Sequence, residues 1–424
     1  MAQYLDIISL VFLVVTITVG FLKKMNIGLL AIGASIILGR IAGISDSSIY
    51  AGFDAKLFTQ LVGVTYLFGV AQVNGTLELV AKKTVSLVGD KTYLVPFILW
   101  ILGGFLTAIG PGNISMGALM TVVAITIAVS TGQNPIFYAL VVKAGTNGFA
   151  MSPITPAGIV GANLGSASGY DPATFSMPVF YNLILWGFVC FILFTILFRK
   201  SIKKGEGTLD RASLGKLNKE QWITIVAMGI MVAMVLGFNI DVGLASFFMA
   251  ALLSFIGICD EKAALAKVPW GTLMLICGVG VLMNIVNQLG GITLLTTALL
   301  SIMTESTSGA IIAGASSLLS FVSSTTGVVM PTMIPTLGGI VTEFGGNVEF
   351  VELLSCVMTG SFSAAFSPAS TGGGLILAAV ASTSGNKISD AEQNKIFGQL
   401  FMAGIGVSVL NVFLAWIGLY SFIG

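Results

Sequence analysis

Two stretches of the chain carry the side chains best suited to binding chemistry. Met151-Ser152-Pro153-Ile154-Thr155-Pro156-Ala157-Gly158 and Phe366-Ser367-Pro368-Ala369-Ser370-Thr371-Gly372-Gly373 each lie inside an apolar segment. Proline removes a backbone N–H and clashes with the preceding turn, so each helix must break there. At membrane depth a break survives only where the backbone is buried in protein or lines a wet cavity. Two breaks at matching positions are typical of the binding sites of membrane carriers.

Two further interruptions add hydroxyls and amides, at the tips of the long segments 93–131 and 308–341. The first is Gly110-Pro111-Gly112-Asn113 and the second is Ser323-Ser324-Thr325-Thr326-Gly327. We expect the two tips and the two breaks to meet in one place. N–H groups at half-helix N-termini suit a carboxylate, whereas unwound carbonyls suit a hard cation such as Na⁺. The alternative is that small polar residues merely let helices pack closely.

The sequence thus predicts two overlapping sets of site residues. The expected substrate-binding residues are Gly112, Asn113, Ser115, Asn147, Thr155, Ser324, Thr325, Thr326, Ser370 and Thr371. The expected Na⁺ ligands, through backbone carbonyls and hydroxyls, are Gly110, Asn113, Ser152, Pro153, Thr155, Ser323, Thr325, Ser367 and Ser370.

Lys143 is a basic residue inside a predicted span, ten positions before Pro153. An intramembrane lysine is a functional hypothesis by default, here as an attractor for an anion or as the occupant of a cation site. Its long stem also allows the ammonium to reach the nearer membrane surface, in which case it would have no role in binding.

The residue types that are absent bear on the coupling ion and on whether the protein is an enzyme. The chain has no histidine, and neither the tips nor the breaks contain Asp or Glu. Proton-coupled carriers usually need an ionisable relay inside the membrane, whereas Na⁺ needs only neutral oxygens. We therefore expect Na⁺ as the coupling ion and no other cofactor, although a substrate carboxylate could carry a proton itself. Since no nucleophile–base pair, metal-ligand cluster or phosphate loop occurs, we do not expect an enzyme.

The elements that position these residues are apolar helices. Of 424 residues, 56% are hydrophobic and only 9% are charged, which predicts an all-α polytopic membrane protein. A polar linker over 199–219 separates two sets of apolar segments. The expected segments are 5–22, 26–43, 55–81, 93–131, 134–165 and 175–198, then 221–238, 241–258, 268–300, 308–341, 352–382 and 396–423.

The second set repeats the first at an offset of 215 positions. This offset relates Ser152 to Ser367, Pro153 to Pro368 and Gly158 to Gly373. It also relates five glycines to glycines in other segments: Gly28 to Gly243, Gly63 to Gly278, Gly75 to Gly290, Gly112 to Gly327 and Gly145 to Gly360. One offset across four segments of each set indicates an internal duplication, with repeats at 1–198 and 220–424.

The basic residues favour one orientation. With the N-terminus outside, the inside loops hold 16 of the 19 lysines and arginines, among them those of the 199–219 linker. The C-terminus is then outside too. The long segment of each repeat could be two full spans or a re-entrant hairpin, and the charges do not separate these options because the chain returns to the same side in both. We expect the hairpin, which leaves five spanning helices in each repeat, one of them broken at the midplane. Because five is odd, the second repeat is inverted relative to the first.

Several stretches resemble the malonate/dicarboxylate carrier family, most specifically over residues 20–160. They are Lys24–Ala31, Leu61–Leu77, Ala108–Asn113 and Ser152–Pro156. That family is similar to the divalent anion/sodium symporters of the ion transporter superfamily. The resemblance implies a homodimer in which scaffold helices, about 5–89 and 221–303, hold the interface. Transport elements, about 93–198 and 308–423, would move as an elevator.

The tips depart from the symporter pattern. In those relatives each tip carries Ser-Asn-Thr, whose amide and hydroxyls touch substrate carboxylates. Here only Asn113 supplies an amide, and the second tip offers Ser324, Thr325 and Thr326 without an Asn.

We therefore expect a secondary carrier of a small dicarboxylate in a bacterial inner membrane. Its expected partners are a small anionic substrate, membrane lipid and a second copy of the chain, with no nucleic acid. Three alternatives stay open: a proton-coupled or exporting anion carrier, a membrane subunit that depends on a binding protein, and a channel.

Overall fold

The computed structural model describes residues 4–86, 92–199, 215–321, 323–368, 370–383 and 390–422, and these form helices joined by turns. The predicted linker 199–219 lies largely outside the described residues. The first half comprises α1 (Leu5–Lys23), α2 (Ile27–Ala42), α3 (Asp46–Ala51), α4 (Ala55–Val73), α5 (Thr76–Ser86), the 3-10 turn η2 (Thr92–Leu94), α6 (Val95–Ala108), α7 (Gly112–Ser130), α8 (Pro135–Gly148), α9 (Pro156–Ala167) and α10 (Pro172–Leu197).

The second half presents its helices in the same order. It comprises α11 (Lys219–Phe238), α12 (Val242–Phe255), α13 (Glu261–Ala266), α14 (Trp270–Gln288), α15 (Gly291–Leu300), the 3-10 turn η5 (Glu305–Thr307), α16 (Ser308–Phe321), the π-helical turn η6 (Thr325–Val329), α17 (Met330–Glu343), α18 (Phe350–Ala364), α19 (Thr371–Thr383), α20 (Asp390–Trp416) and the 3-10 turn η7 (Leu419–Ser421). The bounds of α4 and α14 differ by 215 at both ends, and α18 and α19 begin 215 positions after α8 and α9.

Helix starts recur in the same register. Asn26 and Asp241, 215 positions apart, each accept hydrogen bonds from two N–H groups of the helix that follows. Ser45 accepts from one N–H group of the short helix α3, and Asp260 accepts from two of the short helix α13; neither helix was predicted from the sequence. Such side chains satisfy first-turn donors that have no partner inside the helix, so the four caps help to fix where these helices begin.

Two predicted segments are bent helix pairs rather than single helices. The segment 55–81 breaks between α4 and α5, where the chain turns by 66°, and the segment 268–300 breaks between α14 and α15. The turns contain Gly75 (φ +73°) and Gly290 (φ +84°), again 215 positions apart. Only glycine adopts this backbone region without strain, so both turns depend on glycine. The 215 offset had already paired these two glycines in the sequence.

Five described helices are each long and apolar enough to cross a membrane: α1, α7, α10, α14 and the 394–416 part of α20. The number is seven if two bent pairs each count as one span: residues 46–73 with α5, and α15 with residues 305–321. The helix α6 has 14 residues and is about 21 Å long, short of the roughly 30 Å hydrocarbon core. This length falls short of a full span, whereas α7, which follows the same tip, is among the five.

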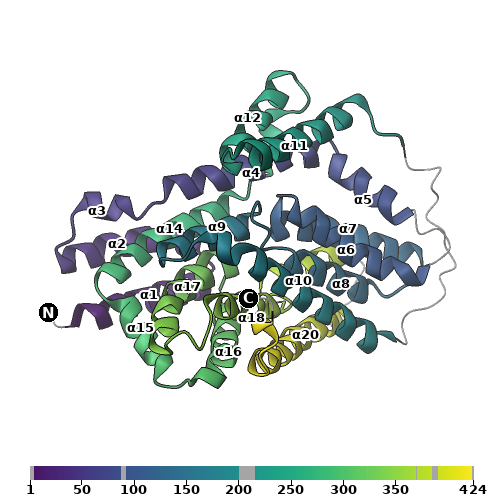
Figure 1. The fold of residues 1–424 in the computed structure, drawn as a ribbon. Coiled ribbons are helices and arrows are strands. Elements are labelled where there is room, and N and C mark those ends of the chain that lie inside the picture. Colours follow the sequence, from purple (N-terminus) through teal and green to yellow (C-terminus); the bar gives the residue numbers. More distant parts are fainter. Residues whose placement is uncertain are drawn as a thin grey trace.

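Crossings between the two halves are also related by the repeat. The helix α2 packs on α14, and α4 packs on α12. A Cβ atom on Gly28 of α2 would collide with the backbone of α14, and one on Gly63 of α4 would collide with Gly243 of α12. In Figure 1, α1, α2 and α3 lie at one end of the molecule and α6, α7 and α8 at the other.

The remaining helices form the bundle that holds the tips and breaks. The helix α8 packs against α6, α7 and α10, and α18 packs against α16, α17 and α20. The halves interlock here, because α7 contacts α19 and α17 contacts α9. Each broken helix thus lies beside a hairpin arm of the other half.

Candidate functional site

The two helix breaks have the same hydrogen-bond pattern. The Thr155 hydroxyl lies in hydrogen-bond reach of the carbonyls of Ala150 and Ser152, and it accepts from the N–H of Gly158 at 3.1 Å. Ser370 repeats this pattern with Ala365, Ser367 and Gly373, each 215 positions on. These hydroxyls replace hydrogen bonds that the broken helices lose, and they cap α9 and α19.

The first tip connects α6 to α7 and is tied to the break of its own half. The Ser152 hydroxyl donates to the carbonyl of Ala108, the last residue of α6, at 2.7 Å. The Asn113 amide donates to the Asn147 side-chain oxygen at 3.1 Å, and Asn147 donates in turn to the carbonyl of Phe362 at 3.5 Å. Phe362 lies 215 positions after Asn147. This chain of amides therefore joins the first tip to the second half of the molecule.

The second tip contains a π-helical turn. Ser324 precedes η6 and accepts through its hydroxyl from the N–H of Gly327 at 3.3 Å. Ser320, on the last turn of α16, donates to the carbonyl of Ser361 at 2.9 Å and lies 3.4 Å from the Thr325 hydroxyl. Single π-helical turns inside helices occur frequently at functional sites.

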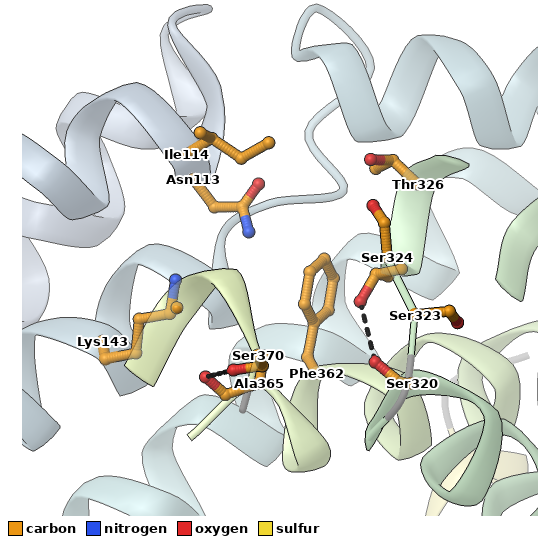
Figure 2. A pocket seen from close by; sticks show the side chains of 12 residues that line it. Asn113, Ile114, Lys143, Ser320, Ser323, Ser324, Thr326, Phe362, Ala365 and Ser370 are labelled. Carbon is orange, nitrogen blue, oxygen red and sulfur yellow. Dashed lines mark hydrogen bonds between the residues drawn. The ribbon is translucent and has the colours of Figure 1, made fainter. Parts of the chain in front are cut away.

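The tips and the second break enclose one cavity (Figure 2). Asn113 and Lys143 lie on one side of it, and Ser324 and Thr326 lie on the other, with Phe362 between them. The cavity volume is about 50 Å³, counted as space open to the centres of water-sized spheres. One water needs about 10–15 Å³ of such space, so there is room for a few water-sized groups. The lining residues are Asn113, Ile114, Lys143, Ser320, Ser323, Ser324, Thr325, Thr326, Phe362, Ala365, Ser370 and Gly372.

The cavity lining carries positive charge and no negative charge. Lys143 is its one charged residue, and no carboxylate contributes to it. Asn113, Thr326 and Gly372 belong to the first turns of α7, η6 and α19, so three helix N-termini reach the cavity. Each N-terminus carries partial positive charge and N–H groups without helical partners. The arrangement favours a small anion.

Lys143 does not extend to the membrane surface. Its exposed fraction is 3%, and its side chain lies among α7, α8 and α19. A Cβ atom on Gly117 would lie 3.5 Å from the ammonium nitrogen, and one on Gly372 would lie 2.9 Å from it. The alternative that the stem carries the ammonium out to solvent is therefore wrong.

The structure brings together seven of the predicted site residues and places the others around them. Those that line the cavity are Asn113, Lys143, Ser323, Ser324, Thr325, Thr326 and Ser370. Gly112 and Ser115 line a smaller neighbouring cavity that shares Asn113 and Thr326 with the first. Asn147 is one hydrogen bond away, through Asn113.

The other predicted residues belong to the framework of the tips and breaks. Gly110 (φ +141°) packs against the ring of Phe68, and Ser367 is fully buried. Ser152 and Thr155 make the framework hydrogen bonds given above, and Pro153 is exposed. The side chain of Thr371 lies outside the described residues, while its backbone begins α19.

Sequence reasoning missed five lining residues: Ile114, Ser320, Phe362, Ala365 and Gly372. The repeat contained a signal for Phe362, which corresponds to Asn147, and for Ala365, which corresponds to Ala150 at the first break. Gly372 stands in the second break itself, directly after the predicted residue Thr371.

Residues 3–150 match the family profile described as "Dicarboxylate carrier protein MatC N-terminus". This match confirms the predicted resemblance over the N-terminal part of the chain. No curated protein matches the chain in a sequence comparison.

Among solved structures, the chain is similar to the YdaH transporter of Alcanivorax borkumensis, whose crystal structure is described as having an unusual topology. The two share 14% sequence identity at a TM-score of 0.59, over 90% of this chain and 88% of that one. At this identity the likeness shows the fold alone. The comparisons lead to transport proteins rather than enzymes, and the chain is a multi-pass helical membrane protein with a transporter fold.

Proposed function

We propose that this protein is a secondary active transporter that moves a small dicarboxylate, such as malonate or a C4 dicarboxylate, across the inner membrane. The observation that carries the proposal is the cavity between the tips. It is lined by one ammonium, an amide, hydroxyls and three helix N-termini, with no carboxylate. The description of the matched family names a dicarboxylate carrier and supports the substrate class. The small cavity volume supports a ligand of few atoms.

Na⁺ is the proposed coupling ion. Two features support a hard cation near each break: the carbonyl-rich unwound backbone and the hydroxyls of Thr155 and Ser370. Among the described residues, no cluster of His, Cys, Asp or Glu offers a stronger metal site. The proposed ligands are those predicted from the sequence, at Gly110, Asn113, Ser152, Pro153, Thr155, Ser323, Thr325, Ser367 and Ser370.

The architecture we propose for the cycle has two inverted repeats, 1–198 and 220–424, in a homodimer. Scaffold helices 5–89 and 221–303 would stay fixed while transport elements 93–198 and 308–423 move as an elevator. Two packing units support this division. The crossings of α2 with α14 and of α4 with α12 form the first unit, and the bundle around α8 and α18 forms the second.

The first test is the thermal stability of the purified protein with C3 to C6 mono-, di- and tricarboxylates, each in NaCl and in choline chloride. A ligand that binds only the folded state raises the melting temperature by mass action. We expect a shift of several degrees with a small dicarboxylate in NaCl and none in choline chloride. A shift that needs no sodium would replace Na⁺ coupling by proton coupling. No shift with any carboxylate would refute the substrate class.

Uptake by proteoliposomes that contain only this chain tests the transport step. We expect accumulation against a substrate gradient when a sodium gradient is imposed. Dependence on an added binding protein would make the chain a membrane subunit, and flux that cannot run uphill would make it a channel.

A further inference from the structure

The Lys143 ammonium is a buried charge without a protein counterion. It lies in α8, 3% exposed, and lines the cavity. Within the described residues it forms neither an ion pair nor a hydrogen bond: the two ion pairs there join Arg40 to Asp46 and Lys82 to Glu78. A buried charge is costly unless it is paired, so this position needs an anion from elsewhere.

No carboxylate on the surrounding helices can serve. In the described parts of the chain, α7, α8 and α19 contain no Asp or Glu. The nearest acidic side chain on α18 is Glu352 in its first turn, whereas the cavity lies at Phe362, about 15 Å further along the helix. Glu352 lines a different cavity together with Glu305. On its other side, the ammonium lies against Gly372 in the first turn of α19, where the partial charge is also positive.

We propose that Lys143 is the fixed cation that pairs with one carboxylate of the substrate, and that it makes the site select dianions over monoanions of equal size. The second carboxylate then lies at the hydroxyls of Ser324 and Thr326 on the opposite side of the cavity, since Ser320 already donates its proton to Ser361. This inference rests on the proposed function and names the group that recognises the charge of the substrate.

The internal repeat places a charged side chain at this position in only one half of the molecule. The position related to Lys143 by the 215 offset is Met358, which is fully buried in α18. The same place in the fold therefore holds an apolar side chain in one half and an ammonium in the other. Packing alone does not require a lysine at this position, and Lys143→Met is the substitution that the fold already accommodates in its second half.

The test pairs this variant with a change of charge on the ligand. Binding of malonate and of its monoamide, malonamate, is measured by calorimetry in NaCl for the wild type, Lys143→Met and Lys143→Arg. The two ligands have nearly the same shape and differ by one negative charge. Removing one partner of a buried charge pair weakens binding by about 30-fold or more. We expect that loss for malonate with Lys143→Met, a much smaller loss for malonamate, and partial retention of the preference with Lys143→Arg.

Each outcome decides a separate question. If Lys143→Met leaves the malonate-to-malonamate affinity ratio within about threefold of the wild type, the charge role of Lys143 is refuted and the proposed function stands. If the wild type binds neither these ligands nor any other dicarboxylate, both proposals fall together. The unliganded Lys143→Met protein should melt no lower than the wild type, because it loses an unpaired buried charge. A lower melting temperature with an unchanged affinity ratio would assign Lys143 a structural role.

A second pair of variants keeps the test decisive if Lys143→Met does not fold. Gly117→Asp places a carboxylate on α7 next to the ammonium, since a Cβ at this position lies 3.5 Å from it. Gly117→Asn adds the same bulk without the charge. An internal counterion should compete with the substrate, so we expect Gly117→Asp to bind malonate at least tenfold more weakly than Gly117→Asn. Equal affinities would overturn the inference.

Discussion

At the scale of single residues, Asn113 connects the first tip to the cavity. One N–H of its amide donates to Asn147, and an amide nitrogen has two hydrogens, so the second remains available for a substrate carboxylate. A hydrogen bond to a charged group is worth about 1.5–3 kcal/mol. We expect Asn113→Ala to raise KM for uptake by roughly tenfold or more without lowering the melting temperature by more than a few degrees.

The control for this variant is Asn287→Ala, because Asn287 is exposed at the end of α14. It should leave both KM and the melting temperature unchanged. Uptake by Asn113→Ala equal to that of the wild type at limiting substrate would remove Asn113 from the site.

Thr155 and Ser370 form the same capping geometry but differ in their relation to the cavity. Both hydroxyls satisfy carbonyls at a break and cap the following helix, while only Ser370 lines the cavity. Loss of such a cap costs about 0.5–2 kcal/mol. We expect Thr155→Ala and Ser370→Ala to lower the free energy of unfolding by similar amounts, and only Ser370→Ala to weaken ligand binding directly.

The measurement is a denaturant titration together with calorimetry of ligand binding for both variants. If Thr155→Ala weakens binding as much as Ser370→Ala at equal stability, the first break contributes to the site as strongly as the second.

At the scale of elements, the crossing of α2 with α14 depends on close backbone approach at Gly28. A methyl group there would collide with the backbone of Met274 and Leu275, which cannot move like a side chain. Overpacking of this kind costs about 1–3 kcal/mol. We expect Gly28→Ala to lower the thermal stability of the protein by several degrees.

Gly33 provides the control on the same helix, because a Cβ there meets nothing within 4 Å. Gly33→Ala should be neutral or stabilising by up to about 1 kcal/mol, since alanine loses less backbone entropy in a helix. Equal stabilities of the two variants would contradict the close crossing.

Some of the elements could be predicted from the sequence alone, and others could not. Proline and glycine encode breaks and turns locally, so the breaks at Ser152–Thr155 and Ser367–Ser370 and the two tips were visible without a structure. The bends at Gly75 and Gly290 were missed because apolar residues resume on both sides of each short polar turn, so each segment was interpreted as one helix. Phe362 and Ser320 were missed because they reach the cavity only through the packing of α16 against α18, which no local pattern encodes.

The sequence allowed two interpretations of the Lys143 side chain, and the packing of the helices around it excludes one of them. Its distance from the break was evident, but binding and extension to the surface were both compatible with its position in the helix. Its burial among α7, α8 and α19 excludes the second possibility.

At the scale of the whole molecule, the two packing units meet at the first tip. The smaller cavity next to the site is lined by Leu61 of α4 and Leu273 of α14 on one side and by Gly112 and Pro156 on the other. The proposed elevator movement would have to separate these surfaces. Such a movement would also break the hydrogen bond that Asn163 of α9 donates to Gln60 of α4 at 3.2 Å.

The orientation of the molecule can be tested with its own cysteines. Cys190, Cys277 and Cys356 are buried, whereas Cys259 is half-buried in the turn between α12 and α13. The distribution of lysines predicts that this turn lies inside the cell. We therefore expect a membrane-impermeant maleimide to label the protein in inverted vesicles and not in intact cells, with Cys259 as the modified residue.

The pH dependence of this labelling follows from the environment of the thiol. Burial raises the pKa of Cys259, and the neighbouring Asp260 and Glu261 act in the same direction. Below that pKa the reactive thiolate fraction grows about tenfold per pH unit. Labelling in inverted vesicles should therefore be faster at pH 8.5 than at pH 7. The matched control is Ser47→Cys in a Cys259→Ser background, because Ser47 is exposed in α3, which the predicted topology places at the opposite face. It should react in intact cells, and labelling of Cys259 there instead would reverse the orientation of both repeats.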